Sequence, residues 1–599
     1  MNKTKPDTAK PTDDHSNHAV RETIESVVVA VILAFLLRSF LVEPFVIPTG
    51  SMAPTLMGRH KDVTCEKCGH EYLTGASSEN DDARDLRTVI ATVCPVCRYR
   101  MVLNPSENAN QATFNGDRIV VSKFAYDLND PKRWDVIVFK FPGNAKQNYI
   151  KRLVGLPNEV VRIFHGDIFV QPGGQGEFQI ARKPEDKLLA MLQLVDDSRN
   201  VADELVDAGW PNRWQPWSPT DAISADNSAT EALDGGRRYA IDASGKQDVW
   251  LRYHHVPPTL NDWRMIEAGQ TPQPTNEGRG QLISDFYAYN AFISIPRGEA
   301  NEYDPSIPPE EFSGGVEIGA RHDRYVNSSD SEVWGMHWVG DLALEGEIDV
   351  KSNEGYLLLN LVEAGVNHTV RINVADGTVE MTRNDGAGEF DSAADSGNGA
   401  NIRKGSTSIR GAGSYTIRFA NVDDQLWLWV DGKLVEFDGP TTFVAGQDQN
   451  PKWSPQDPGD LAPAGVGASG LSIELNRLRI WRDLYYLAIS DQPGYATGRS
   501  DYDLFRSNGQ ILEIFASPEK WASTDLFESR RAIEFVMEDR QYFPLGDNSP
   551  QSSDARLWRA PPYVERDMLL GKAVMIYWPH GWNRPVPFTP NVRRMGVIR

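Results

Sequence analysis

A short proline-rich stretch follows the long apolar segment of this chain: Phe45-Val46-Ile47-Pro48-Thr49-Gly50-Ser51-Met52-Ala53-Pro54-Thr55-Leu56. Pro44 and Pro48 end any helix that precedes them, because proline lacks a backbone donor and restricts the residue before it. Residues 45–47 are therefore expected to be extended. Ser51, between a glycine and two prolines, is expected in a turn close to the end of the apolar segment.

The apolar segment runs from Thr23 to Val42, and its uninterrupted part, Val27 to Leu37, is followed by Arg38 and Ser39. A membrane-spanning helix needs roughly 20 apolar residues, which the whole segment supplies if Arg38 reaches the far interface. A cleaved signal peptide and a buried soluble helix are the alternatives. No Ala-x-Ala-like cleavage site follows the segment, which disfavours the signal peptide.

We predict a single transmembrane anchor at residues 23–42 behind a polar cytoplasmic tail at residues 1–22. The basic residues before the anchor favour a cytoplasmic N-terminus under the positive-inside rule, and they are Lys3, Lys5, Lys10 and Arg21. Everything after residue 42 would then lie outside the cell membrane.

The length and charge of the chain limit the number of domains and the kinds of partner that we expect. With 599 residues it is too long for one hydrophobic core, so two to four domains are expected. A formal net charge of −22, from 83 acidic and 61 basic residues, argues against a nucleic-acid-binding protein.

The apolar pattern predicts a mainly β fold. Short apolar runs separated by turn residues occupy residues 114–170 and recur in the last 90 or so residues. Between about 325 and 490 the alternation is strict: Leu426, Leu428 and Val430 alternate with tryptophans and precede an Asp431-Gly432 hairpin turn. We predict a jelly-roll-like β-sandwich there, and the pattern resembles the concanavalin-like domains of the laminin-G type.

Ser51 needs a base to act as a nucleophile. The chain has no G-x-S-x-G turn, and none of its 11 histidines lies in a convincing motif. Lys151 has apolar neighbours on both sides, and burial lowers the pKa of a lysine toward the range of a general base. Taken singly, Ser51 also fits a turn serine and Lys151 an exposed strand lysine. Taken together beside an anchor, they indicate peptide hydrolysis at a membrane surface.

Four stretches resemble, in order, the conserved boxes of bacterial type I signal peptidases, the membrane-bound serine–lysine proteases that remove signal peptides. The boxes are Pro48–Leu56, Gly116–Phe124 with Arg133–Phe139, Tyr149–Pro157, and Gly546–Arg556. With the anchor, the resemblance covers about 200 residues. It implies that the substrates are preproteins with Ala-x-Ala-like sites and that catalysis needs no cofactor.

The resemblance also implies a role for each matching residue. Ser51 would be the nucleophile and Lys151 the general base. The Thr49 hydroxyl, with the Ser51 backbone N–H, would form the oxyanion hole, and Ser552 would orient the lysine. The remaining residues fall into a supporting group (Asp547, Asp554 and Arg556) and a group lining the substrate pockets (Phe45, Ile47 and Ile150).

Three departures from the family pattern occur at these boxes. Thr49 stands where serine is common and keeps the hydroxyl donor. Ser549-Pro550 replaces a charged pair, and Ala555 replaces a serine beside Asp554, so one supporting hydrogen bond is in doubt.

The four cysteines form two C-x-x-C pairs, Cys65 with Cys68 and Cys94 with Cys97. This spacing suits tetrahedral zinc in a zinc-ribbon-like insert at residues 61–103. Two disulfides are the alternative, and a redox C-x-x-C lacks its usual β-α context. Four cysteines leave no open coordination position, so the predicted zinc is structural.

The predicted architecture is a peptidase β domain that is interrupted twice. Its first segment occupies residues 43–170 and includes the zinc-ribbon-like insert. An inserted region at 171–510 carries the sandwich at about 325–490, and residues 511–599 complete the peptidase domain. The predicted location is the bacterial cytoplasmic membrane, with the catalytic domain on the outer side. The alternatives are a tethered protein- or glycan-binding module on a degenerate peptidase core, and a membrane protease for other precursors.

Overall fold

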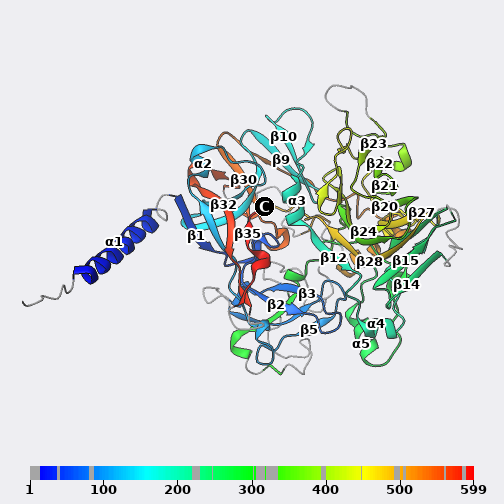
Figure 1. Cartoon of the computed structure of the whole chain (residues 1–599), viewed down its shortest axis with the longest axis horizontal. Helices are drawn as coiled ribbons and strands as arrows, with labels where there is room; N and C mark the ends of the chain where they lie inside the picture. The colour runs from blue at the N-terminus through cyan, green and yellow to red at the C-terminus, as the bar shows by residue number, and fades with distance from the viewer. Residues whose placement is uncertain are drawn as a thin grey trace, which may run out of the picture.

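The structure is a computed structural model that describes residues 14–36, 41–79, 86–218, 229–245, 247–300, 303–304, 317–318, 335–392, 400–446, 448–491, 500–502, 508–558, 561–582 and 589–599. The fold is mainly β, as the alternation of apolar residues predicts. Two β-rich halves lie side by side, and helix α1 extends away from one of them (Figure 1).

The first half is built on an eight-stranded sheet, here called the catalytic sheet, which joins the two ends of the chain (Figure 1). Its strand order is β1 (Val42–Val46), β6 (Arg118–Ser122), β32 (Leu569–Trp578), β7 (Val136–Phe141), β8 (Asn144–Gly155), β30 (Gln541–Leu545) and β31 (Val564–Glu565), with β35 (Gly596–Val597) on β32. Strand β1 is an edge strand. Strand β8 lies between β7, which precedes it, and β30, which follows it by almost 400 residues.

A four-stranded sheet packs beside the catalytic sheet. Its order is β11 (Gln179–Ile180), β10 (Asp167–Pro172), β9 (Glu159–Phe164) and β29 (Ile533–Val536). The two sheets share one hydrophobic core, in which Leu153 and Phe543 meet Ile163. Tyr486 and Met191, both from the region 171–510, are buried in the same core. The inserted region is therefore packed into the catalytic half.

The second half is a β-sandwich of two antiparallel sheets. One contains β14 (Thr230–Leu233), β15 (Arg238–Asp242), β28 (Ser472–Arg482), β19 (Leu342–Val350), β24 (Gly413–Val422), β25 (Gln425–Val430) and β26 (Lys433–Leu434), with β12 (Gln193–Asp197) on β28. The other contains β13 (Trp214–Trp217), β16 (Asp248–Tyr253), β27 (Ala464–Ser469), β20 (Tyr356–Glu363), β21 (Val366–Asn373), β22 (Thr378–Arg383) and β23 (Ile402–Ser406).

The sandwich core lies between these two sheets. Leu344 and Phe419 from one sheet pack against Leu359 and Val466 from the other, and all four are buried. Strands β12 to β16 lie before residue 325, so the sandwich includes chain that shows little periodicity. The turn residues Gly, Pro, Asp and Asn, which are frequent between 171 and 320, conceal these short strands from a pattern analysis.

The four cysteines belong to a small module that contains strands from two distant parts of the chain. One sheet has the order β18 (Glu317–Ile318), β17 (Phe292–Pro296), β4 (Arg87–Val93) and β5 (Arg100–Val102), and a hairpin joins β2 (His60–Thr64) to β3 (Glu71–Gly75). A further two-stranded sheet pairs β33 (Gly581–Trp582) with β34 (Thr589–Pro590). The cysteine module is therefore completed by β17 of the inserted region.

Within the described ranges the helices are few and mostly short. They are α1 (Asp14–Leu36), α2 (Ala125–Leu128), α3 (Glu185–Met191), α4 (Asp203–Asp207), α5 (Leu260–Glu267), α6 (Asn508–Phe515) and α7 (Pro518–Trp521). Four short 3-10 turns surround the candidate site: η2 (Gly50–Met52), η7 (Ala288–Asn290), η12 (Ser549–Gln551) and η13 (Ala555–Leu557).

The structure does not contain the single helix that we expected over residues 23–42. Helix α1 ends at Leu36, and Val42 already belongs to β1, where it pairs with Ser122. The apolar part of α1, Val27 to Leu36, is ten residues long and spans about 15 Å, roughly half of a bilayer core. Among the described residues, no helix is long and apolar enough to cross a membrane. Residues 37–40 of the expected anchor lie outside the described residues.

Candidate active site

Ser51 and Lys151 meet at the centre of the catalytic half. Ser51 lies in the turn η2, which follows the edge strand β1, and Lys151 lies in the middle of β8. The Lys151 Nζ atom is 2.7 Å from Ser51 Oγ and 3.0 Å from the carbonyl oxygen of Ile150. Both side chains are buried, with exposures of 9% for Ser51 and 4% for Lys151. The pair has the distance that proton transfer from the serine to the lysine requires.

The surroundings of Lys151 favour its neutral form. Burial lowers the pKa of Lys151 from 10.5 to about 8, and the carboxylates of Asp554 and Asp547 oppose part of this shift. Desolvation disfavours the ammonium form because a charge is poorly stabilised away from water. A large share of the lysine amines is therefore free to accept a proton at mildly alkaline pH.

This lowered pKa predicts the pH dependence of activity. The rate should rise with pH as Lys151 loses its proton, with an apparent pKa of about 8 in kcat/KM for the free enzyme. Activity at pH 7 should be roughly 10% of the plateau value. A kcat/KM profile between pH 6 and 10 measures this, and an acidic limb with an apparent pKa near 10.5 would contradict a desolvated base.

The two residues implied for the oxyanion hole differ in burial, since Thr49 is exposed and Ser51 is buried. Thr49 is exposed and precedes η2, and its side chain makes no capping hydrogen bond to the turn. The next backbone N–H, that of Gly50, donates to Ser77 Oγ at 3.2 Å. Ser77 comes from the segment that follows β3 of the cysteine module, and the sequence contained no signal for this contact.

Ser552 lies beside the dyad, but its hydroxyl makes no hydrogen bond to Lys151. It is 2% exposed, and its Oγ atom has no hydrogen-bond partner among the described residues. The orienting contact implied by the resemblance is therefore not formed in this structure. A Cβ atom on Gly546 would lie 2.1 Å from Ser552 Oγ and 2.4 Å from the Ser51 carbonyl oxygen, so only glycine permits this close approach.

Asp554 and Arg556 form a buried ion pair that holds the last box. Arg556 donates to both carboxylate oxygens of Asp554, at 2.8 and 2.7 Å, and neither side chain is exposed. Asp554 also accepts from the Gly546 backbone N–H at 3.0 Å. Arg556 further donates to the Leu487 carbonyl and to the hydroxyl of Ser549. Ser549 is thus a supporting residue, whereas the family pattern indicated only a lost charge at this position.

A second buried ion pair joins β8 to the last box. Arg152 donates through Nε and Nη2 to the two oxygens of Asp547, both at 2.7 Å, and both side chains are fully buried. Thr55 Oγ1 donates to Asp547 at 2.5 Å. Burial alone would lower the pKa of Arg152, but the Asp547 carboxylate raises it above its usual value. The alternation of side chains along β8 predicts that Arg152 and Lys151 lie on opposite faces of the strand. It does not predict that the face carrying Arg152 is also buried.

The three residues implied for the substrate pockets share one small apolar cluster. Ile47 is buried there with Met52, while Phe45 and Ile150 are partly buried against the same cluster. These side chains lie on β1, on β8 and on the segment that leads from β1 into η2. The cluster therefore brings the pocket residues next to the Ser51 turn.

The four cysteines come together as a compact sulfur cluster. All four are buried and unpaired, and their Sγ atoms lie within 4.8 Å of one another. The Cys65 and Cys97 sulfurs are 3.5 Å apart, and those of Cys68 and Cys94 are 3.6 Å apart. A disulfide would bring two sulfurs to about 2 Å, whereas tetrahedral zinc with bonds of about 2.3 Å would separate them by about 3.8 Å. The arrangement fits a metal better than two disulfides.

A buried serine–lysine pair on a mainly β scaffold defines a candidate serine hydrolase of the dyad type. The protein-family model for signal peptidase, peptidase S26, matches residues 20–68, 86–206 and 503–578. These three segments contain both members of the dyad and the last box. They leave out residues 207–502, which include most of the sandwich.

Known signal peptidases are also similar to part of the chain. Signal peptidase I of Pseudomonas fluorescens is 33% identical over 130 residues, which cover 22% of this chain and 30% of the relative. Signal peptidase I P of Bacillus subtilis subsp. natto is 24% identical over 174 residues, which cover 29% of this chain and 63% of the relative. The match spans about a third of the length of the Pseudomonas protein. These similarities support a serine endopeptidase.

Solved structures are similar to about a quarter of the chain, and only weakly. A galectin of Caenorhabditis elegans is 10% identical with a TM-score of 0.16, covering 24% of this chain and 83% of the galectin. A carbohydrate-binding module of Bacillus subtilis is 13% identical with a TM-score of 0.15, covering 24% of this chain and 73% of the module.

Proposed function

We propose that the protein is a membrane-bound serine endopeptidase that removes N-terminal signal peptides from exported preproteins. The observation that carries the proposal is the buried pair in which Lys151 Nζ lies 2.7 Å from Ser51 Oγ. The similarity of the surrounding segments to signal peptidases supplies the substrate class.

The proposed reaction has two steps. Neutral Lys151 accepts the Ser51 hydroxyl proton while Ser51 Oγ attacks the carbonyl carbon at the cleavage site. The Ser51 backbone N–H and the Thr49 hydroxyl stabilise the negative oxygen of the tetrahedral intermediate. The lysine proton passes to the leaving amine, and an ester on Ser51 remains. Water then attacks this ester with Lys151 again as base, which releases the acid and restores the serine.

The proposed substrate binds as an added β-strand along residues 45–49. Support comes from the position of β1 at the edge of the catalytic sheet, next to the Ser51 turn. Small side chains beside the scissile bond would face the pocket of Phe45, Ile47 and Ile150. This cluster is largely filled by its own residues, which favours small substrate residues such as alanine.

Membrane attachment through residues 23–42, with a cytoplasmic N-terminus and the catalytic half outside, is part of the proposal. Within residues 20–33, the part of α1 whose side chains the structure describes, the large apolar side chains are exposed: Val29 and Val31 by 62% each, and Leu33 by 54%. The helix also extends away from the folded body beside β1 (Figure 1). An apolar helix of this kind is stabilised by lipid.

We also propose that Cys65, Cys68, Cys94 and Cys97 hold one structural zinc ion. The sulfur distances fit a tetrahedral site, and the four cysteines are buried in one hydrophobic cluster that also contains residues of the inserted region. Zinc would supply folding energy there and no catalytic chemistry.

Purified protein should contain one zinc per chain by elemental analysis, and Cys97→Ser should contain none. Loss of zinc should lower the Tm of the full chain because the four buried thiolates lose the ion that joins them. A protein without zinc, whose unreduced mass is lower by the four hydrogens of two disulfides, would contradict this site.

The experiment that tests the proposed function is cleavage of a preprotein by the full chain in detergent. A preprotein with an Ala-x-Ala site should be cut after the second alanine, as shown by the N-terminal sequence of the product. The same preprotein with phenylalanine in place of that alanine should remain intact. Cleavage of both at the same rate would exclude signal-peptide specificity and indicate a protease for other precursors.

A further inference from the structure

The stretch from Asp285 to Pro296 crosses from the β-sandwich to the cysteine module. At one end, Arg482 of β28 donates to the carbonyl oxygens of Asp285 and Phe286, at 2.8 and 3.0 Å. At the other end, β17 pairs with β4, where Ile293 lies opposite Ala91. Both ends of the stretch are therefore fixed, and the turn η7 between them has a defined position.

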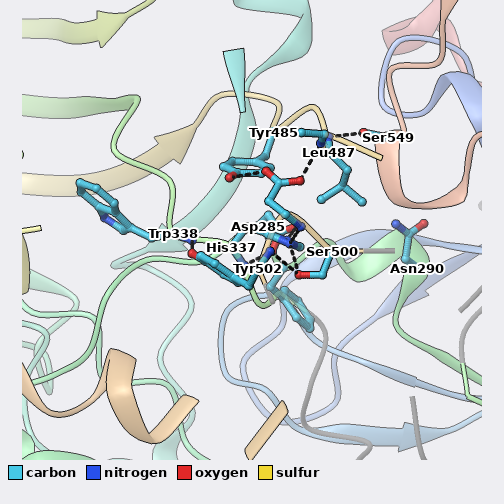
Figure 2. A network of polar contacts seen from close by, with 12 residues as sticks. Asp285, Asn290, His337, Trp338, Tyr485, Leu487, Ser500, Tyr502 and Ser549 are labelled. Atoms are coloured by element: carbon cyan, nitrogen blue, oxygen red, sulfur yellow. Dashed lines mark hydrogen bonds and ion pairs between the residues drawn. The ribbon is translucent and has the colours of Figure 1, made fainter. Parts of the chain in front are cut away.

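A buried histidine adds a further restraint on this stretch (Figure 2). The Asp285 carboxylate accepts from the backbone N–H of His337 and lies 2.9 Å from its Nδ1 atom, while His337 Nε2 lies 3.0 Å from Ser500 Oγ. Burial alone would lower the pKa of His337, but the Asp285 carboxylate raises it above its ordinary value. The hydrogen bonds of His337 therefore tie Asp285 to the chain around Ser500.

The turn η7 presses against the glycine that precedes the nucleophile. A Cβ atom on Gly50 would lie 2.2 Å from a ring carbon of Tyr289, and Tyr289 is 2% exposed. The Tyr289 hydroxyl donates to the carbonyl oxygen of Arg59 at 3.1 Å. The Tyr289 ring thus forms one wall of the Ser51 turn.

Asn290 reaches the same turn through Asn548. The two side-chain amides donate to each other, with both distances 2.8 Å, and both residues are buried. Asn548 in turn donates through its side chain to the Gly50 carbonyl at 3.1 Å, and through its backbone N–H to the Ser51 carbonyl at 3.1 Å. Asn548 therefore ties the last box to the nucleophile turn, and Asn290 fixes the orientation of the Asn548 side chain.

We propose that Asn290 is a positioning residue for Ser51, acting through Asn548, so that the inserted region is a structural part of the active site. This inference rests on the proposed function. Residues 285–296 lie outside the segments that match the peptidase family, so this support is particular to the chain with its insert. Without the amide pair, the Asn548 side chain would keep only its hydrogen bond to the Gly50 carbonyl, so it would hold the nucleophile turn less firmly.

The first arm of the test is kinetic. Asn290→Ala should lower kcat by between about 10-fold and 100-fold, because a small displacement of a nucleophile is costly. KM and the apparent pKa of the profile should stay unchanged, since Asn290 touches neither substrate nor Lys151. In a double-mutant cycle, Asn548→Ala and the double variant should have similar rates, because the two residues act as a unit. Asn401→Ala, which removes an exposed amide of the same inserted region, is the matched control and should be unchanged.

The second arm needs no substrate. Hydrogen exchange of peptides covering residues 45–58 and 546–556 should be faster in Asn290→Ala than in the wild type and in Asn401→Ala, because the two segments lose a common restraint. The Tm of the folded chain, measured in parallel, identifies any variant that has simply unfolded. Tyr289→Phe keeps the ring against Gly50 and should leave exchange in residues 45–58 nearly unchanged.

The outcomes separate the positioning role from the proposed function. If the wild type cleaves and Asn290→Ala equals it in kcat and in exchange, the positioning role is overturned while the peptidase stands. If the wild type cleaves no preprotein, the proposed function fails, and the exchange arm alone decides whether Asn290 holds the turn. Additive losses in the double-mutant cycle would also overturn the role, since they would mean that Asn290 does not act through Asn548.

Discussion

Replacing Lys151 by methionine is expected to lower kcat/KM by at least about 10⁴-fold, the loss typical of removing the base from a nucleophile–base pair. Methionine has nearly the same length and remains compatible with a buried position, but it accepts no proton from Ser51. The change corresponds to about 5.5 kcal/mol in the activation barrier. Hydrolysis of a fluorogenic peptide with an Ala-x-Ala site measures it over the required range.

The same variant should keep its fold. Burial lowers the pKa of Lys151 to about 8, so at neutral pH the folded protein bears the cost of a desolvated ammonium group. Methionine removes that cost, and the Tm should therefore stay the same or rise. Lys146→Met is the matched control, because Lys146 lies on the same strand, β8, and is exposed. Equal loss of activity in both variants, or a loss in Lys151→Met that follows unfolding, would contradict a role as base.

Replacing Asp547 by alanine is expected to destabilise the protein by about 3–5 kcal/mol, because it leaves a fully buried guanidinium without its carboxylate. Arg152 keeps its hydrogen bond to the Trp134 carbonyl, but its charge is no longer compensated. The pair links β8, which carries Lys151, to the box that carries Ser552, so activity should fall together with stability. Guanidinium unfolding of the full chain gives the free-energy difference.

An exposed ion pair provides the control for Asp547→Ala. Arg162 and Glu534 also join two strands that are distant in sequence, with side-chain exposures of 34% and 45%. Solvent screens such a pair, so Glu534→Ala should cost at most about 1 kcal/mol. Similar losses for the two substitutions would show that the buried pair contributes no more than a surface one.

The chemistry of the site was accessible from the sequence because its residues lie in short local patterns. Ser51 between glycine and prolines and Lys151 among apolar neighbours are each ambiguous alone, and the resemblance to the family boxes gave them their roles although they lie 100 residues apart. The same resemblance implied that Asp554 and Arg556, which are close in sequence, support the last box. Both residues belong to one short turn, and short turns are predictable from local sequence.

The residues that support the site could not be predicted from the sequence, because their contacts join segments that are far apart in the chain. Asn290 has no motif, and it reaches Asn548 because Arg482 holds one end of its stretch and the pairing of β17 with β4 holds the other. Arg152 was expected on the face of β8 opposite Lys151, but its burial depends on Asp547, 395 residues later. The early sandwich strands were missed for another reason: β13 and β14 are four residues long, too short to show a period.

The predicted anchor shows that the number of apolar residues does not fix where a helix ends. The apolar residues from 23 to 42 are numerous enough for a span, yet Arg38 and Ser39 interrupt them, and the residues after 41 pair with β6 as strand β1. Pairing of Val42 with Ser122 gives the backbone hydrogen bonds that a sheet requires. A count of apolar residues does not distinguish this strand from the end of a helix.

Cleavage of an Ala-x-Ala preprotein by the purified full chain, compared with its Ser51→Ala variant, most directly tests the assignment of Ser51 as the nucleophile of a signal peptidase. The wild type should release the mature protein with the expected N-terminus, while Ser51→Ala should retain the same Tm and release no detectable product. Cleavage at equal rates by the two proteins, or by neither, would contradict it.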